Sequence, residues 1–162
     1  MNFLVYIVLG LILTPIITLI HELGHAIAGL IFTNKDVKIK IGNANLNKKL
    51  KLLRLIIEFN GYNSIVNLNY GLTEWNKPNK TYQSIIIYLS GPLFSLLMFI
   101  LSSYIILICN EYNIIYILFQ IFSLLTFIQF IFTIFPIEYK NYAYYKNKSD
   151  GYKIIELLNN KK

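Results

Sequence analysis

The stretch Phe3–Phe32 reads FLVYIVLGLILTPIITLIHELGHAIAGLIF, and Glu22 is its only formally charged residue. A helix of this length, at about 1.5 Å per residue, exceeds the roughly 30 Å thickness of the hydrocarbon core of a bilayer. The stretch therefore predicts a membrane-spanning helix. Ionisable groups inside such a helix are costly and usually functional, so Glu22 and the neighbouring His21 and His25 require a chemical explanation.

His21 and His25 are the only histidines of the chain and enclose the run HELGH. Residues four apart share one face of a helix, close enough for two imidazoles to bind one zinc ion. Glu22 lies about 100° around the helix from His21, where it can reach a water molecule at the metal and act as a general base. The run predicts zinc-dependent hydrolysis, although the same short pattern also arises by chance in helices without a metal.

The composition predicts one small integral membrane domain covering residues 1–162, with 56% hydrophobic residues and a mean hydropathy of +0.52. After a first helix over residues 3–33, apolar segments at 84–109 and 112–135 predict two more spanning helices joined by a turn at Asn110-Glu111. A cytoplasmic loop and a short helix then cover residues 136–162. The expected fold class is an α-helical polytopic membrane protein with a small membrane-associated β hairpin or sheet after its first helix.

The region over residues 34–82 carries the strand patterns. Val37–Ile41 alternates apolar and basic residues, Leu50–Phe59 fits a strand or a surface-lying helix, and Ser64–Tyr70 alternates again. We expect a small antiparallel sheet or hairpin at the cytoplasmic membrane face, and an extended substrate can pair with the strand Val37–Ile41, although a merely structural hairpin fits as well. The basic residues expected to face the lipid headgroups are Lys48, Lys49, Lys51 and Arg54.

The distribution of positive charge predicts the orientation in the membrane. All fifteen Lys and Arg residues lie either between Lys35 and Lys80 or from Lys140 to the C-terminus. Three crossings place both regions on one side, and positively charged flanks mark the cytoplasm. We therefore expect a multi-pass protein of the cell membrane with its N-terminus outside and its C-terminus in the cytoplasm. Topology and attraction to the anionic lipid bilayer explain the net charge of +7 better than nucleic-acid binding does.

A third metal ligand is needed, because a catalytic zinc site normally has three protein ligands and a water molecule. In the predicted topology Cys109 and Glu111 lie at the opposite membrane surface from the histidines. Asp150, which precedes Gly151 and the short C-terminal helix, is the first candidate ligand, with a role as helix N-cap as its alternative. Glu138 is the next candidate.

Three motifs, in this order, resemble those of intramembrane zinc metalloproteases of the site-2 protease type. They are HELGH in the first helix, Ser90-Gly91-Pro92 in the second, and Pro136 followed by Asp150-Gly151 after the third. The resemblance spans almost the whole chain. It implies an intramembrane zinc endopeptidase that hydrolyses peptide bonds of membrane-embedded or membrane-bound proteins and peptides.

The resemblance also implies residue roles. One zinc ion per chain is expected to be bound by His21, His25 and Asp150, with Glu22 as the catalytic base. Substrate binding or transition-state support is expected from Gly91, Pro92 and Ser95. The family usually has asparagine at the position of Ser95. It also often has asparagine shortly before the third-helix proline, where this chain has Thr133.

Two alternatives to a protease keep the metal. One is a zinc-binding membrane protein that serves as a transport component, with Glu22 as a proton or metal relay. The other is an inactive relative that binds peptides, which the serine at position 95 suggests.

Overall fold

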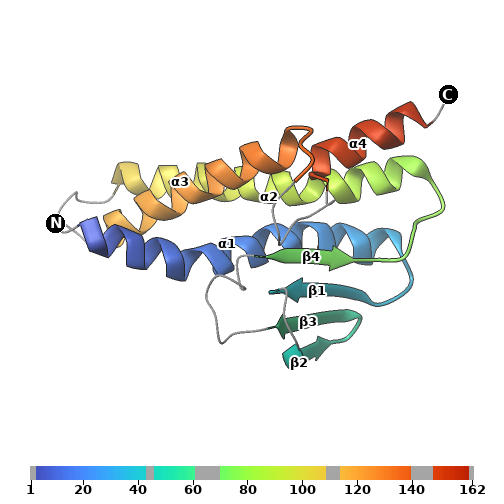
Figure 1. Ribbon diagram of the computed structural model, residues 1–162, viewed down its shortest axis with the longest axis horizontal. Coiled ribbons are helices and arrows are strands. Elements are labelled where there is room, and N and C mark those ends of the chain that lie inside the picture. The colour runs from blue at the N-terminus through green and yellow to red at the C-terminus, as the bar shows by residue number, and fades with distance from the viewer. Residues whose placement is uncertain (1–2, 43–45, 61–69, 109–113, 140–147, 161–162) are drawn as a thin grey trace.

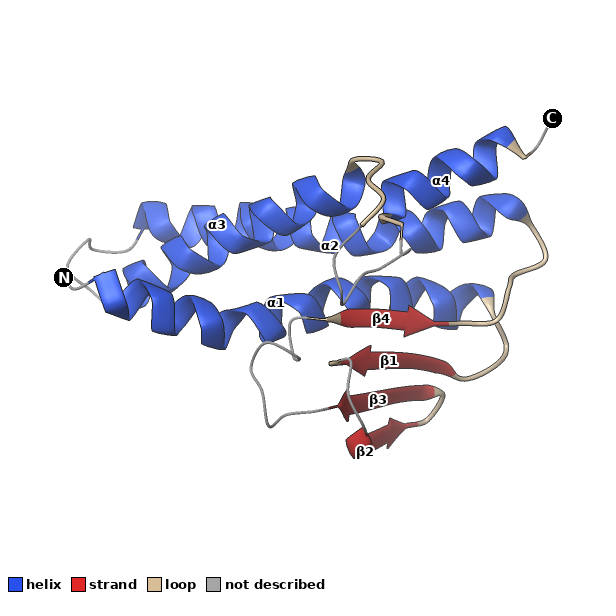
Figure 2. Cartoon of the chain, in the orientation of Figure 1, coloured by secondary structure: helices blue, strands red, loops and turns tan. Residues whose placement is uncertain are grey.

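A computed structural model describes residues 3–42, 46–60, 70–108, 114–139 and 148–160. This part of the chain is mostly helical, with a four-stranded mixed sheet after the first helix (Figures 1 and 2), which confirms the predicted fold class. Three helices are long and apolar enough to cross a membrane: α1 (Phe3–Phe32), α2 (Thr81–Ile108) and α3 (Ile114–Ile134). The predicted turn at Asn110-Glu111, together with Cys109, lies outside the described residues, as does the predicted strand Ser64–Tyr70 except for its last residue.

The sheet contains β1 (Val37–Ile41), β2 (Leu46–Leu52), β3 (Leu55–Asn60) and β4 (Gly71–Glu74) in the order β2-β3-β1-β4. The predicted strand Val37–Ile41 is confirmed as β1. The expectation of an antiparallel sheet is wrong, because β2 forms a hairpin with β3 and so returns β3 parallel to β1. β4 is antiparallel to β1.

The segment Leu50–Phe59, predicted as one strand or a surface-lying helix, contains a turn instead. It is divided between β2 and β3 at Leu53 and Arg54, and Leu53 has a φ of 53°. The Arg54 guanidinium donates hydrogen bonds to the carbonyls of Leu30 and Thr33, which ties this turn to the end of α1.

An apolar layer attaches the sheet to α1. The alternation in β1 buries Val37, Ile39 and Ile41, and these side chains cluster with Ala26 of α1. Partly buried apolar side chains of α1 complete the layer, namely Leu19, Leu23 and Leu30. The sheet consequently lies along the C-terminal half of α1, with β4 as the edge strand next to the helices (Figure 1).

The basic residues predicted to face the headgroups are largely engaged within the protein. Lys49 lies 3.7 Å from Glu58, and Lys51 lies 3.2 Å from Asp36. These ion pairs are solvent-exposed on the lysine side, so each contributes little to stability.

Helix α2 approaches α1 closely at Gly24. A Cβ atom at Gly24 would lie 2.6 Å from the carbonyl oxygen of Ser90, a distance that real side chains essentially never show. Glycine at this position therefore permits the contact that sets HELGH against the Ser90-Gly91-Pro92 motif.

We expect Gly24→Ala to lower the free energy of unfolding by about 1–3 kcal/mol, because the new methyl group overpacks against the α2 backbone. Gly10→Ala in the same helix is the matched control, since no atom lies within 4 Å of a Cβ there. That control should be neutral or stabilising by up to about 1 kcal/mol. Thermal unfolding in detergent measures both, and equal effects of the two changes would contradict the proposed contact.

Candidate metal centre

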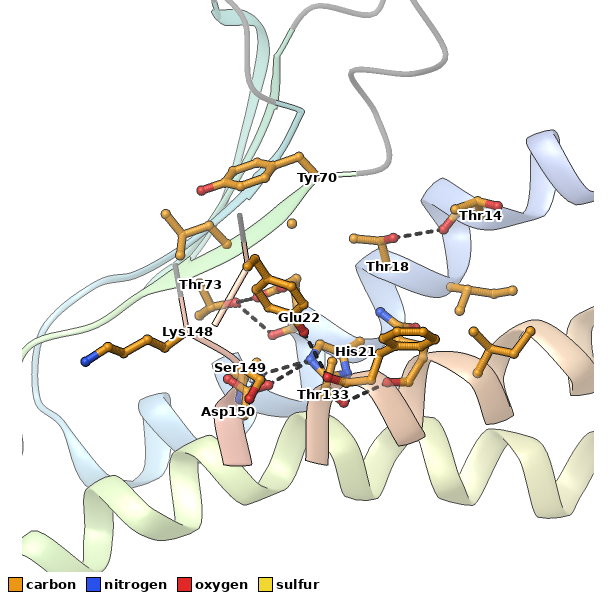
Figure 3. A pocket seen from close by; sticks show the side chains of 18 of the residues that line it. Thr14, Thr18, His21, Glu22, Tyr70, Thr73, Thr133, Lys148, Ser149 and Asp150 are labelled. Atoms are coloured by element: carbon orange, nitrogen blue, oxygen red, sulfur yellow. Dashed lines mark hydrogen bonds and ion pairs between the residues drawn. The ribbon is translucent and has the colours of Figure 1, made fainter. Parts of the chain in front are cut away.

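Three buried side chains converge from α1 and from α4 (Asp150–Asn159). The Nε2 atom of His21, the Nε2 atom of His25 and the Oδ2 atom of Asp150 lie 3.2 Å from one another in all three pairs. Within the described ranges, these residues form the one group of three His, Cys, Asp or Glu side chains that could hold a metal ion. Figure 3 shows His21, Asp150 and the neighbouring Glu22 close together.

Hydrogen bonds orient both imidazole rings. His25 Nδ1 lies 2.7 Å from the carbonyl oxygen of Ile87, which can only accept, so Nδ1 carries a proton and donates it. In its neutral form, His25 then presents the lone pair of Nε2 to the other two atoms. His21 Nδ1 lies 2.9 Å from Ser95 Oγ. Metal-binding histidines are typically held by such outer hydrogen bonds.

The spacing of the three atoms fits a metal ion. Ligand atoms bound at 2.0–2.1 Å in a tetrahedron lie about 3.3 Å apart, close to the spacing found here. Two imidazole nitrogens and a carboxylate oxygen are all electron-rich, and burial makes their mutual repulsion costly unless a cation lies among them. One proton can bridge two of these atoms, whereas a metal ion bridges all three.

Gly91 provides the space for the second imidazole. A Cβ atom at Gly91 would lie 2.2 Å from His25 Nε2, so glycine allows the ring to lie against α2. Pro92 is buried in the same helix, and the Ser95 hydroxyl faces His21. The structure thus brings Gly91 and Ser95 to the histidines that could hold a metal ion, and substrate contacts of Gly91, Pro92 and Ser95 stay a prediction.

Asp150 is the first residue of α4, and Ser149 is its N-cap. The Ser149 Oγ atom accepts a hydrogen bond of 3.2 Å from the backbone N–H of Tyr152. The N-cap alternative for Asp150 is therefore wrong, and its carboxylate is free to face the histidines. Glu138, the other candidate ligand, is exposed, forms an isolated β-bridge with Lys148 and does not belong to the group of His21, His25 and Asp150.

Two contacts return the chain to the site after α3. The Ser149 N–H donates to the carbonyl of Ile137, and the Ile137 N–H donates to Ser149 Oγ, both at 2.9 Å. A Cβ atom at Gly151 would lie 1.8 Å from the carbonyl oxygen of Ile134. The Asp-Gly pair therefore lets α4 begin directly against the end of α3.

Glu22 is buried on the side of α1 that faces β4. Its Oε2 atom accepts a hydrogen bond of 2.7 Å from the Thr73 hydroxyl. A Cβ atom at Gly71 would lie 2.8 Å from Glu22 Oε1, so glycine leaves room for the carboxylate. Strand β4 thus fixes the predicted base, a role that the sequence did not indicate for Gly71 or Thr73.

A cavity of about 450 Å³ joins these residues. Its walls come from α1, β4, α3 and α4, and four polar residues of α1 line it at helical spacing, namely Thr14, Thr18, His21 and His25. Trp75, the single tryptophan of the chain, stacks with its ring centroid 6.1 Å from that of His25. Metal binding is therefore expected to change tryptophan fluorescence.

Tyr139 lines the same cavity from the segment after α3. Burial first, and then the negative charge of Asp150, raise the pKa of the Tyr139 phenol to about 12. The phenol stays protonated and donates a hydrogen bond of 2.9 Å to the carbonyl of Phe132. The sequence around Tyr139 is rich in tyrosine and did not indicate that this residue bonds to the carbonyl of Phe132.

Comparisons with protein-family models, with curated proteins and with solved structures found no match for this chain. The functional assignment therefore depends on the residues and their geometry.

We expect Ser95→Ala to weaken the affinity for a divalent metal by about 10- to 100-fold, because His21 loses the partner that orients its ring. Ser102→Ala is the matched control, since buried Ser102 bonds to the carbonyls of Met98 and Phe99 in its own helix. Titration with Co²⁺, followed by quenching of Trp75 fluorescence, measures both affinities. Equal affinities in the two variants would contradict the orienting role.

Proposed function

We propose that the chain is an intramembrane zinc endopeptidase that cuts membrane-embedded or membrane-bound peptides. The observation that supports this most strongly is the convergence of His21, His25 and Asp150 beside a buried Glu22, within helices apolar enough to span a membrane. The resemblance of three motifs to site-2 proteases supports it further. Zinc bound by these three residues would polarise the scissile carbonyl and lower the pKa of a water molecule.

Glu22 would transfer the proton in this reaction. The Thr73 hydroxyl occupies Oε2, so Oε1 is the atom available to accept a proton from the attacking water. The water oxygen bonds to the carbonyl carbon while Glu22 takes its proton. Glu22 then delivers this proton to the amide nitrogen as the C–N bond breaks, which releases an amine and a carboxylic acid, and the acid then gives its proton to the amine to leave a carboxylate and an ammonium group.

The place for an extended substrate strand differs from the one expected. The expectation that an extended substrate pairs with Val37–Ile41 is wrong, because β3 and β4 occupy both edges of β1. β4 ends the sheet on one side, and Gly71, Leu72 and Thr73 line the cavity. A substrate held in extended form would lie along this strand.

The charge distribution supports an orientation with the N-terminus outside and the C-terminus in the cytoplasm. Both basic regions would then lie in the cytoplasm. The ends of α1 and α3 that flank the metal group would face the cytoplasm, so cleavage would occur in the cytoplasmic half of the bilayer.

A second candidate is a metal-binding relative without peptidase activity. It is favoured by Ser95, whose hydroxyl faces His21 and does not line the cavity. A metal-loaded protein that binds membrane peptides without cleaving them would support this candidate.

We expect Glu22→Gln to retain its metal and to lose cleavage by at least about 10²-fold, because the amide cannot accept the proton. Protein reconstituted in liposomes with lysine-flanked transmembrane peptides is assayed by mass spectrometry of the products, and metal is measured by elemental analysis. Cleavage at the wild-type rate by Glu22→Gln would rule out the proposed role of this residue.

We expect Thr73→Val to lower kcat by about 10- to 100-fold, as for loss of one hydrogen bond to a charged group. Thr73→Ser keeps the hydroxyl and is the control that should retain most of the activity. Metal content should be unchanged in both, since Thr73 does not contact the metal group. A serine variant as impaired as the valine variant would show that shape, and not the hydrogen bond, matters at this position.

A further inference from the structure

Two lysines line the cavity beside the candidate metal group, Lys148 and Lys153. Their side chains are 32% and 31% exposed, so both are largely enclosed. Lys148 donates a hydrogen bond to the carboxylate of Glu156. Lys153 belongs to α4, and the carboxylate nearest to its ammonium group in the described part of the chain is that of Asp150, 3.8 Å away and beyond hydrogen-bond distance. Lys153 therefore brings a positive charge and unused N–H donors to the cavity.

The two oxygens of Asp150 face different partners. Oδ2 lies 3.2 Å from both histidine Nε2 atoms, whereas Oδ1 lies 3.8 Å from the Lys153 ammonium group. Lys153 is thus adjacent to the candidate metal group on its α4 side. A positive charge at this place repels a metal cation, so metal binding alone does not explain it. An ammonium group there is suited to a negatively charged atom of a ligand.

Aromatic rings fix the place of this ammonium group relative to the histidines. The Nζ atom of Lys153 lies 5.1 Å from the centroid of the Tyr88 ring, a distance at which the ring attracts a cation. Tyr88 contacts Trp75, with their centroids 5.1 Å apart, and Trp75 stacks on His25. One continuous row of side chains therefore connects Lys153 of α4 to His25 of α1.

Other donors of the cavity are already engaged. The hydroxyls of Thr73, Ser149 and Tyr139 line it, and each donates a hydrogen bond within the protein. Ser95, from which transition-state support is expected, faces His21 and does not line the cavity. Peptide hydrolysis places negative charge on the scissile carbonyl oxygen, and a donor directed at that oxygen lowers the barrier. Lys153 is the cation placed to supply it.

We propose that the Lys153 ammonium group binds a negatively charged oxygen of a ligand at the metal group. This inference rests on the proposed function, in which that oxygen belongs to the scissile carbonyl as the water attacks. Lys153 donates a hydrogen bond to it and keeps its own protons. The same contact would bind the terminal carboxylate of the product. The ligand class is therefore peptides with a charged backbone oxygen, and Lys153 is a catalytic residue.

The test compares Lys153→Met with Lys148→Met. The two lysines line one cavity and are almost equally exposed, but Lys148 has a carboxylate as its hydrogen-bond partner. Lys153→Arg keeps the positive charge. The probes are N-acetyl-leucine, which carries a carboxylate, and its neutral amide. All variants are made in the Glu22→Gln background and loaded with Co²⁺, whose visible absorption reports binding of the probes.

We expect Lys153→Met to bind N-acetyl-leucine about 10- to 100-fold more weakly than the parent, as for loss of a hydrogen bond to a charged group. Binding of the amide should not change, and Lys148→Met should bind both probes like the parent. Lys153→Arg should bind the carboxylate more tightly than Lys153→Met does. The Co²⁺ affinity of Lys153→Met should equal or exceed that of the parent, because a nearby positive charge is removed.

Two results of these titrations would overturn the inference. One is unchanged binding of N-acetyl-leucine by Lys153→Met, or an equal loss in Lys148→Met. The other is a loss of Co²⁺ affinity in Lys153→Met as large as its loss of carboxylate affinity, because Lys153 would then act only by orienting Asp150.

Activity distinguishes this inference from the proposed function. With Glu22 present, Lys153→Met should lower kcat for lysine-flanked transmembrane peptides by about 10²-fold and change KM little. Binding of N-acetyl-leucine through Lys153 without any cleavage by the wild type would support the anion site and overturn the peptidase proposal. Cleavage by Lys153→Met at the wild-type rate, with unchanged carboxylate binding, would support the peptidase and overturn the role of Lys153. A wild type that binds no Co²⁺ would overturn both.

Discussion

The convergence of two imidazole nitrogens and one carboxylate oxygen, 3.2 Å from one another inside the protein, is the constraint on which the rest of the structure depends. Three electron-rich atoms this close together are costly to bury unless a proton or a metal cation lies among them. His25 Nδ1 donates to a backbone carbonyl, which leaves its Nε2 lone pair facing the other two atoms. The protein therefore directs three atoms that could hold a metal ion at one position.

Glycines bring the elements that carry these ligands together. Gly24 allows α1 to approach α2, Gly91 makes room for the His25 ring, and Gly151 lets α4 begin against the end of α3. At each site a Cβ atom would lie within 2.6 Å of a backbone oxygen or of the ring. The three sequence motifs thus share a physical basis, because each contains a glycine that permits close packing of the elements around the candidate metal group.

Much of the fold could be predicted from the sequence, because long apolar runs and the alternation in Val37–Ile41 are strong local signals. The sheet topology could not, since the turn at Leu53-Arg54 lacks glycine, proline or asparagine, and strand order depends on packing against α1. The convergence of His21, His25 and Asp150 agrees with the resemblance of the three motifs, which implied that these residues share one site. Thr73 gave no sequence signal, because its importance depends on its hydrogen bond with Glu22, which is distant in the chain.

Zinc content of the detergent-purified protein tests the central claim most directly. Elemental analysis of the wild type, Asp150→Ala and Glu138→Ala shows which of the two carboxylates zinc binding requires, the buried one of Asp150 or the exposed one of Glu138. Close to one zinc per chain in the wild type and in Glu138→Ala, with loss in Asp150→Ala, is the predicted result. A wild type purified without chelators that contains no zinc, or an Asp150→Ala variant that keeps it, would contradict the account.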